Sequence, residues 1–168
     1  MRLAIVLLLL SAGAAHAGDG FEAVRCGGDV RGALIGRTMS NEAVAGIEAR
    51  HAALRLKNLG GDEVSDTINS TSWRICGKEY VVTTDGRDKM RDVLAFPEHS
   101  KATPEFSAGE CDANGRTIAG AIVGVLDTDK THVKAAWTTD EKTGKFSALA
   151  VAGLSCPKAS IITADGGP

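Results

Sequence analysis

The sequence predicts an α+β fold in which one main helix, about residues 41–53, packs on an antiparallel sheet of about six strands. Three observations predict it: an apolar stripe at helical spacing, several short β-branched runs separated by turn signals, and four cysteines that follow an export signal. The richest β-forming stretch is residues 73–84, which holds the only Tyr of the chain. We expect this stretch to be the structural centre of the fold.

The N-terminus has the pattern of a secretory signal peptide. Arg2 precedes an apolar run over residues 3–10, and Ala15-His16-Ala17 is a small-x-small cleavage signal. This run is shorter than the roughly 20 apolar residues of a membrane anchor. We therefore expect cleavage after Ala17, a mature single domain over residues 18–168 without a membrane span, and a periplasmic or secreted location.

Two helical segments are predicted before the strands. Asp29 is placed to cap a short turn that Gly36 ends. Ser40 is the expected N-cap of the main helix. The apolar face of that helix comprises Val44, Ile47, His51 and Leu54.

Runs of β-forming residues predict the six strands. They cover residues 67–75, 79–84, 90–96, 118–126, 133–139 and 146–151. Asp85-Gly86 is the strongest hairpin signal between them. The apolar residues of 97–116 repeat with neither the helical nor the strand period, so a long loop is expected between two β regions.

The four cysteines predict two structural disulfides. Cys26, Cys76, Cys111 and Cys156 are an even set in an exported chain. Three connectivities are possible, and the pairing Cys26–Cys76 with Cys111–Cys156 is favoured because it closes each half of the chain on itself. Their wide spacing is unlike that of a zinc site or a redox pair.

Composition excludes several classes of function. The 19 basic residues are balanced by 21 acidic ones, which argues against nucleic acid as a main partner. Aromatic residues are only 4% of the chain, too few for a stacked carbohydrate-binding platform. No motif predicts a metal site, a cofactor or a complete catalytic set. Glu48 and His51 match one helical Glu-x-x-His element, but its required second copy is missing.

The function hypotheses centre on the expected loop. The leading one is an exported, non-enzymatic binding or inhibitor-like protein, which uses the loop to contact a protein partner. Its candidate contact residues are Glu98, His99, Lys101 and Glu105. Alternatives are a small periplasmic hydrolase that uses His99 with a nearby acid, and an envelope structural or assembly component. Sequence alone leaves the partner and the oligomeric state open.

Overall fold

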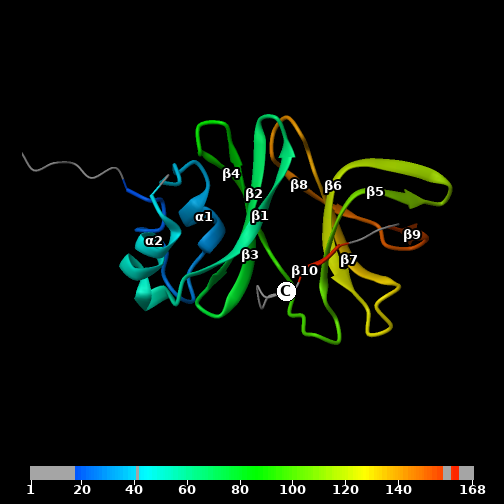
Figure 1. Cartoon of the computed structure of the whole chain (residues 1–168), viewed down its shortest axis with the longest axis horizontal. Helices are drawn as coiled ribbons and strands as arrows, with labels where there is room; N and C mark the ends of the chain where they lie inside the picture. The colour runs from blue at the N-terminus through cyan, green and yellow to red at the C-terminus, as the bar shows by residue number, and fades with distance from the viewer. Residues whose placement is uncertain (1–17, 41, 157–159, 163–168) are drawn as a thin grey trace, which may run out of the picture.

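The computed structural model describes residues 18–40, 42–156 and 160–162, and it shows a mostly β protein. Two antiparallel sheets form the body of the molecule, and two short helices lie on the outer side of the first sheet (Figure 1). The predicted class is therefore right in its antiparallel pairing and its disulfides. It overestimates the helical part, because the structure has short helices and two sheets in place of one main helix packed on one sheet of about six strands.

The elements follow in a simple order. The helices are α1 (Val30–Leu34), α2 (Val44–Arg50) and the single 3-10 turn η1 (Ala52–Leu54). The first sheet contains β1 (Lys57–Ser65), β2 (Ile68–Ile75), β3 (Lys78–Asp85) and β4 (Met90–Ala95), in that spatial order. The second sheet contains β5 (Glu105–Ala113), β6 (Arg116–Leu126), β7 (Val133–Thr139), β8 (Phe146–Leu149), β9 (Leu154–Ser155) and β10 (Ser160–Ile162). Its strand order is β10-β5-β6-β7-β8, and β9 pairs with the far end of β5.

The helical segment is shorter than predicted because the chain leaves helical geometry at His51. The φ and ψ angles of His51 are −104° and 30°, and its Nε2 donates a 2.7 Å hydrogen bond to the buried carboxylate of Asp19. The predicted apolar face is buried at Ile47 and Leu54, whereas Val44 is 42% exposed. The helix over 41–53 is thus a seven-residue helix followed by a 3-10 turn.

The two predicted caps have different outcomes. Asp29 is the N-cap of α1, and its Oδ1 accepts a 2.9 Å hydrogen bond from the backbone N–H of Gly32, as predicted. Ser40 does not cap α2, whose N-cap is Ala43. Its Oγ instead accepts a hydrogen bond from the backbone N–H of Glu42, in the turn before the helix.

The stretch 73–84 is the centre of the first sheet, as expected. It forms the β2–β3 hairpin, in which Trp73 pairs with Tyr80 and Arg74 with Glu79. Trp73 is 1% exposed and lies 5.0 Å from the ring of Phe21, beneath the helices. This core lies between the sheet and the helical segment and includes Leu34, Ile47, Ile75, Val82 and Met90.

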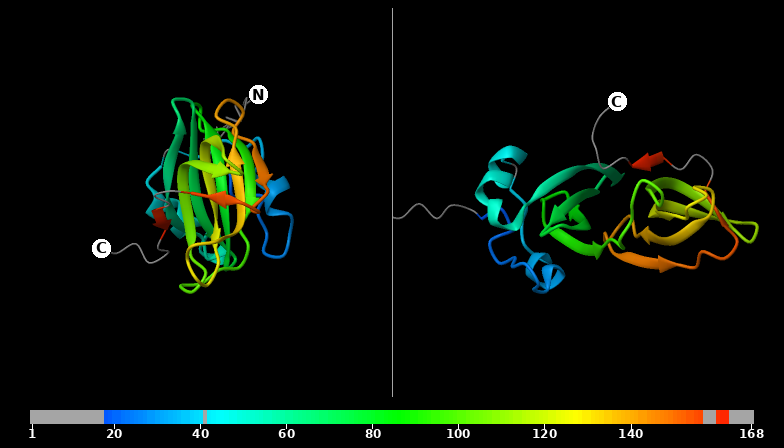
Figure 2. Two further views of the ribbon diagram at one scale, coloured as in Figure 1. Left: turned by 90° about the vertical axis from the view of Figure 1, so that its right-hand side faces the viewer. Right: turned by 90° about the horizontal axis from the view of Figure 1, so that it is seen from below.

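The second face of the first sheet packs against the second sheet. A small apolar cluster joins them, made of Val81, Phe96 and Val125 with partly buried Leu94, Val123 and Phe146. The molecule is thus layered, with helices, first sheet and second sheet in sequence (Figure 2). Alternate residues of β3 and β6 consequently contribute to different cores.

The residues predicted as a long loop over 97–116 are largely strand. β5 begins at Glu105 and pairs with β6, which begins at Arg116, through a tight turn at Asn114-Gly115. Only the connection of residues 96–104 between the two sheets is irregular. Phe106 and Cys111 of β5 are buried in the core of the second sheet, while Glu105 and Ser107 line a pocket between the sheets.

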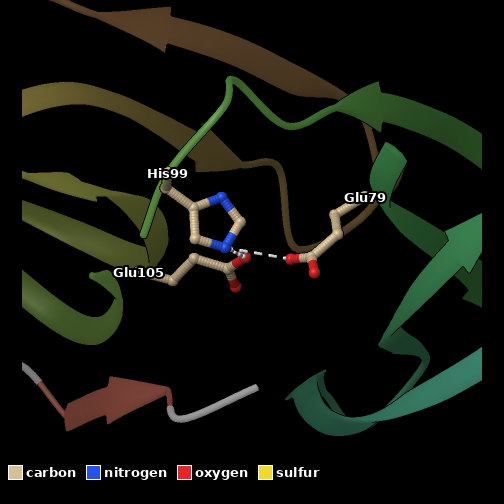
Figure 3. A group of neighbouring side chains, drawn as sticks. All are labelled: Glu79, His99 and Glu105. Atoms are coloured by element: carbon tan, nitrogen blue, oxygen red, sulfur yellow. Dashed lines mark ion pairs between the residues drawn. The ribbon is translucent and has the colours of Figure 1, made fainter. Parts of the chain in front are cut away.

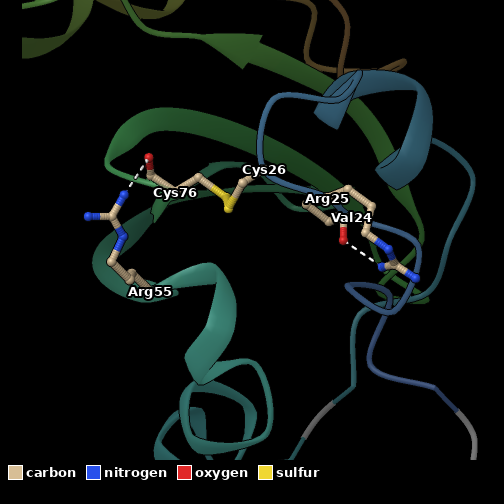
Figure 4. Close-up of a disulfide and its surroundings, with 5 residues drawn as sticks. All are labelled: Val24, Arg25, Cys26, Arg55 and Cys76. Atoms are coloured by element: carbon tan, nitrogen blue, oxygen red, sulfur yellow. Dashed lines mark hydrogen bonds between the residues drawn. A yellow bond between two sulfur atoms is a disulfide. The ribbon is translucent and has the colours of Figure 1, made fainter.

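Both disulfides are present with the favoured pairing, Cys26–Cys76 and Cys111–Cys156. Cys26–Cys76 ties the N-terminal segment to the turn between β2 and β3, where Arg55 also donates a hydrogen bond to the Cys76 carbonyl (Figure 4). Two disulfides indicate an oxidising location outside the cytoplasm. Residues 1–17 lie outside the described residues, so the signal peptide stays a prediction. Within the described ranges, no helix has the length and apolar character needed to cross a bilayer.

Candidate functional site

Three ionisable side chains converge in the space between the two sheets. His99 Nε2 lies 2.6 Å from Glu105 Oε1 and 3.0 Å from Glu79 Oε2 (Figure 3). The side chains of His99 and Glu79 are each 13% exposed, and that of Glu105 is 6% exposed. We call Glu79, His99 and Glu105 the acid–histidine cluster.

Each member of the cluster comes from a different segment. Glu79 is near the start of β3, and Glu105 is the first residue of β5. His99 lies in the irregular connection, which is held to the second sheet where the backbone N–H of Leu126 donates a 2.9 Å hydrogen bond to the Pro104 carbonyl. The T-shaped contact between His99 and Phe96, with ring centroids 5.8 Å apart, fixes the other side of the imidazole.

Hydrogen bonds at the rim of the cluster orient its members. His99 Nδ1–H donates a 3.0 Å hydrogen bond to the Pro97 carbonyl, which directs Nε2 at the two carboxyl groups. Arg74 donates hydrogen bonds of 3.0 Å and 2.6 Å from Nε and Nη2 to Glu79 Oε1. Glu79 Oε2 is buried, accepts no hydrogen bond within the described part of the chain, and points into the cluster.

The surroundings of Glu105 and Glu79 shift the pKa values of these two carboxyl groups in opposite directions. Burial, together with the Glu79 carboxyl beside it, raises the pKa of Glu105 to about 8. Burial also acts to raise the pKa of Glu79, but contact with the Glu105 carboxyl and the Arg74 guanidinium outweighs it and holds that pKa below its usual value. Glu105 is therefore the weaker acid of the two carboxyl groups.

A pocket of about 300 Å³ adjoins the cluster between the two sheets. Glu105 belongs to both the cluster and the pocket wall. Apolar lining comes from Leu59, Val81, Phe96 and Val123, and polar lining from Asp62, Ser70, Ser72 and Ser107. Gly60 and Gly61 of β1 complete the lining. The pocket thus offers hydroxyl groups and apolar surface side by side.

The structure brings together two of the four residues predicted to contact a partner. His99 and Glu105 meet inside the molecule, whereas Glu98 and Lys101 are exposed on the same connection. Glu79 and Arg74 were not predicted from the sequence. Their cross-strand pairing in the β2–β3 hairpin was foreseeable, but their proximity to His99 depends on how the two sheets pack.

Two other histidines have local roles. His51, with Arg50, pairs with the buried carboxylate of Asp19. Glu48 does not join them, because its Oε1 accepts a hydrogen bond from the backbone N–H of Asn58. His132 pairs with Asp129 in an exposed turn. Among the described residues, Glu48 and His51 of the Glu-x-x-His match therefore have different partners and do not form a common site.

Comparison of this chain with protein-family models, with curated proteins and with solved structures found no match.

Proposed function

We propose that this chain is an exported, non-enzymatic binding protein that holds a small ligand in the pocket between its two sheets. The observation that carries the proposal is the pocket itself, whose volume of about 300 Å³ lies at the lower end of ligand-binding cavities. Each of the two sheets that form its walls belongs to a half of the chain that holds its own disulfide, which constrains each wall before a ligand arrives.

The lining indicates the kind of ligand. Phe96, Val81 and Val123 present apolar surface, and the hydroxyl groups of Ser70, Ser72 and Ser107 can donate or accept hydrogen bonds. Such a lining suits a small molecule with an apolar part and one hydrogen-bonding edge. The exposed Glu98 and Lys101 remain candidates for contact with a protein partner, as the sequence suggested, but His99 and Glu105 are buried away from that surface.

The test is to recover a ligand from the native compartment. Purified protein is incubated with a small-molecule extract of the envelope fraction, separated by gel filtration and examined by mass spectrometry. We expect a bound small molecule with the unmodified chain and none with Ser107→Phe, which fills the pocket. Ser147→Phe, on the exposed side of β8, is the matched control and should retain the ligand. Equal recovery with Ser107→Phe, or no recovery with the unmodified chain, would refute the proposal.

A second candidate function is a small hydrolase in which His99 and Glu105 exchange a proton with the substrate. The 2.6 Å separation of Nε2 and Glu105 Oε1, on a carboxyl group that lines the pocket, favours it. Turnover of any member of an ester, peptide and glycoside panel that disappears in His99→Gln would support this alternative. An inactive unmodified chain across that panel would argue against it.

The third hypothesis, an envelope assembly component, requires a sizeable exposed apolar patch or an open sheet edge. Among the described residues, Val44 is the large hydrophobic side chain that is exposed, and it stands alone. The sheets end at β1, β4, β8 and β10, and β1 is made irregular by register shifts in its pairing with β2. This hypothesis has less support than the other two.

A further inference from the structure

We propose that the acid–histidine cluster is a binding site for one divalent transition-metal ion of the zinc type. This inference does not rest on the proposed ligand-binding function. Its basis is that one donor atom from each of Glu79, His99 and Glu105 lies within 4.8 Å of the other two. Two carboxylate oxygens and one imidazole nitrogen form a ligand set that zinc accepts.

The two distances from His99 to the carboxylate oxygens are close to those that a metal ion needs, and the Glu79 and Glu105 donor oxygens lie within 4.8 Å of each other. A tetrahedral ion with bonds of about 2.0–2.1 Å separates neighbouring ligand atoms by about 3.3 Å. The observed separations from His99 Nε2 are 2.6 Å to Glu105 Oε1 and 3.0 Å to Glu79 Oε2. Side-chain rotations that open these contacts by less than about 1 Å would admit the ion.

The surrounding hydrogen bonds already direct each ligand atom inward. With Nδ1–H donating to the Pro97 carbonyl, neutral His99 presents the lone pair of Nε2 to the cluster. With Arg74 bound to Glu79 Oε1, the remaining oxygen Oε2 is buried and has no hydrogen-bond partner among the described residues. A buried, unpartnered carboxylate oxygen that faces a lone pair is costly unless a cation lies between them.

The imidazole nitrogen favours a transition metal over magnesium or calcium. Thiolate ligands are not available, because Cys26, Cys76, Cys111 and Cys156 form disulfides.

The protein supplies three ligands, which leaves a fourth position. Because Glu105 also lines the pocket, a small molecule in the pocket would lie beside that position. Zinc sites with three protein ligands and one open position are typical of sites that take water or a ligand as the fourth partner.

The test uses the exported protein with both disulfides formed, freed of metal with a chelator and titrated with zinc chloride by calorimetry. We expect one zinc ion per chain. Loss of a residue that only orients a metal ligand weakens binding about 10–100-fold, so His99→Gln should weaken it at least as much. His132→Gln is the matched control, because His132 also pairs with an aspartate but lies in an exposed turn.

A measurement on the unmodified chain makes the test independent of whether the variants fold. In long-range ¹H–¹⁵N spectra of the imidazole rings, zinc should shift the Nε2 resonance of His99 and leave His132 unchanged. Absence of zinc binding, equal affinity in His99→Gln, or an unshifted His99 resonance would each overturn the proposal. Binding lost only in His132→Gln would assign the ion to the exposed turn and would overturn it too.

Discussion

Thr83 Oγ1 donates a 2.6 Å hydrogen bond to the carbonyl oxygen of Gly144, 61 residues further along the chain, and so links the first sheet to the turn before β8. The same hydroxyl accepts a 3.0 Å hydrogen bond from the backbone N–H of Asp92. Thr83 is fully buried. The buried Thr83 hydroxyl therefore satisfies polar backbone groups of β4 and of the turn before β8, at the contact between the two sheets.

The first prediction concerns this hydroxyl. Thr83→Val keeps the shape of the side chain but leaves the Gly144 carbonyl and the Asp92 N–H without a partner. We expect the free energy of unfolding to fall by about 1–3 kcal/mol, measured by urea titration. Thr71→Val, on the neighbouring strand β2, is the control and should change stability by less than about 0.5 kcal/mol. Equal effects of the two variants would contradict this role of Thr83.

The second prediction concerns acid stability. Burial acts to raise the pKa of Asp92, but the Arg31 guanidinium, 2.8 Å away, and the backbone N–H groups of Phe146 and Val93 outweigh it and hold the pKa below its usual value. In the unfolded chain an Asp has a pKa of about 3.9. The stabilisation is thus complete above that pH and is lost as the pH falls through the lower, folded pKa.

We therefore expect the free energy of unfolding to fall more steeply between about pH 5 and pH 2 in the unmodified chain than in Asp92→Asn. The measurement is a series of urea titrations across that range. Asp66→Asn, in the exposed turn between β1 and β2, should retain the full slope. A slope in Asp92→Asn as steep as in the unmodified chain would show that Asp92 does not supply this acid dependence.

The third prediction concerns the Cys26–Cys76 disulfide. It closes a long segment of chain, with a sequence separation of 50, over the core beneath α1 and α2. Replacing both cysteines by alanine should lower the free energy of unfolding by about 2–5 kcal/mol. Ligand and zinc binding, measured under conditions where the variant is folded, should be unchanged because the disulfide contributes no atom to the pocket or the cluster. Loss of binding in the folded variant would contradict that separation of roles.

The fourth prediction compares two glycines of the second sheet. A Cβ on Gly124 would overlap the backbone carbonyl of Ala135 and the fully buried ring of Phe106. Gly124→Ala should destabilise the fold by about 1–3 kcal/mol. Gly109 of β5 has nothing within 4 Å of the equivalent position, so Gly109→Ala should be neutral or slightly stabilising. Thermal unfolding of both variants checks the difference, and a reversed order would contradict the close packing of β5, β6 and β7.

The strands that sequence reasoning identified are those with a strong local signal. β-branched residues and turn signals placed β2, β3, β4, β6, β7 and β8 to within a few residues. β1 was missed because Gly60-Gly61 resembles a break. It is an edge strand that carries a register shift beside Gly60, whose φ is +106°.

β5 was missed for a different reason. Its run Glu105-Phe106-Ser107-Ala108-Gly109 alternates, but polar Glu105 and Ser107 face the space between the sheets, where no core was expected. Because packing between two sheets was not expected, the acid–histidine cluster was not predicted either. Sequence reasoning singled out His99 and Glu105 as neighbours in one loop, yet Glu79 joins them only through the packing of two sheets. Contacts between sheets carry no periodic signal in a single sequence.

The order of the strands along the chain has a consequence for how the molecule opens. All of β1–β4 precede residue 96 and all of β5–β10 follow residue 104, and each half holds its own disulfide. Strand pairing is therefore confined to each half, which allows each half to open as a separate cooperative unit. Amide hydrogen exchange should then be slowest within β2–β3 and β5–β6, and faster across residues 96–104. Both the pocket and the acid–histidine cluster lie where the two halves meet, so their geometry depends on the packing between the halves as well as on the folding of each half.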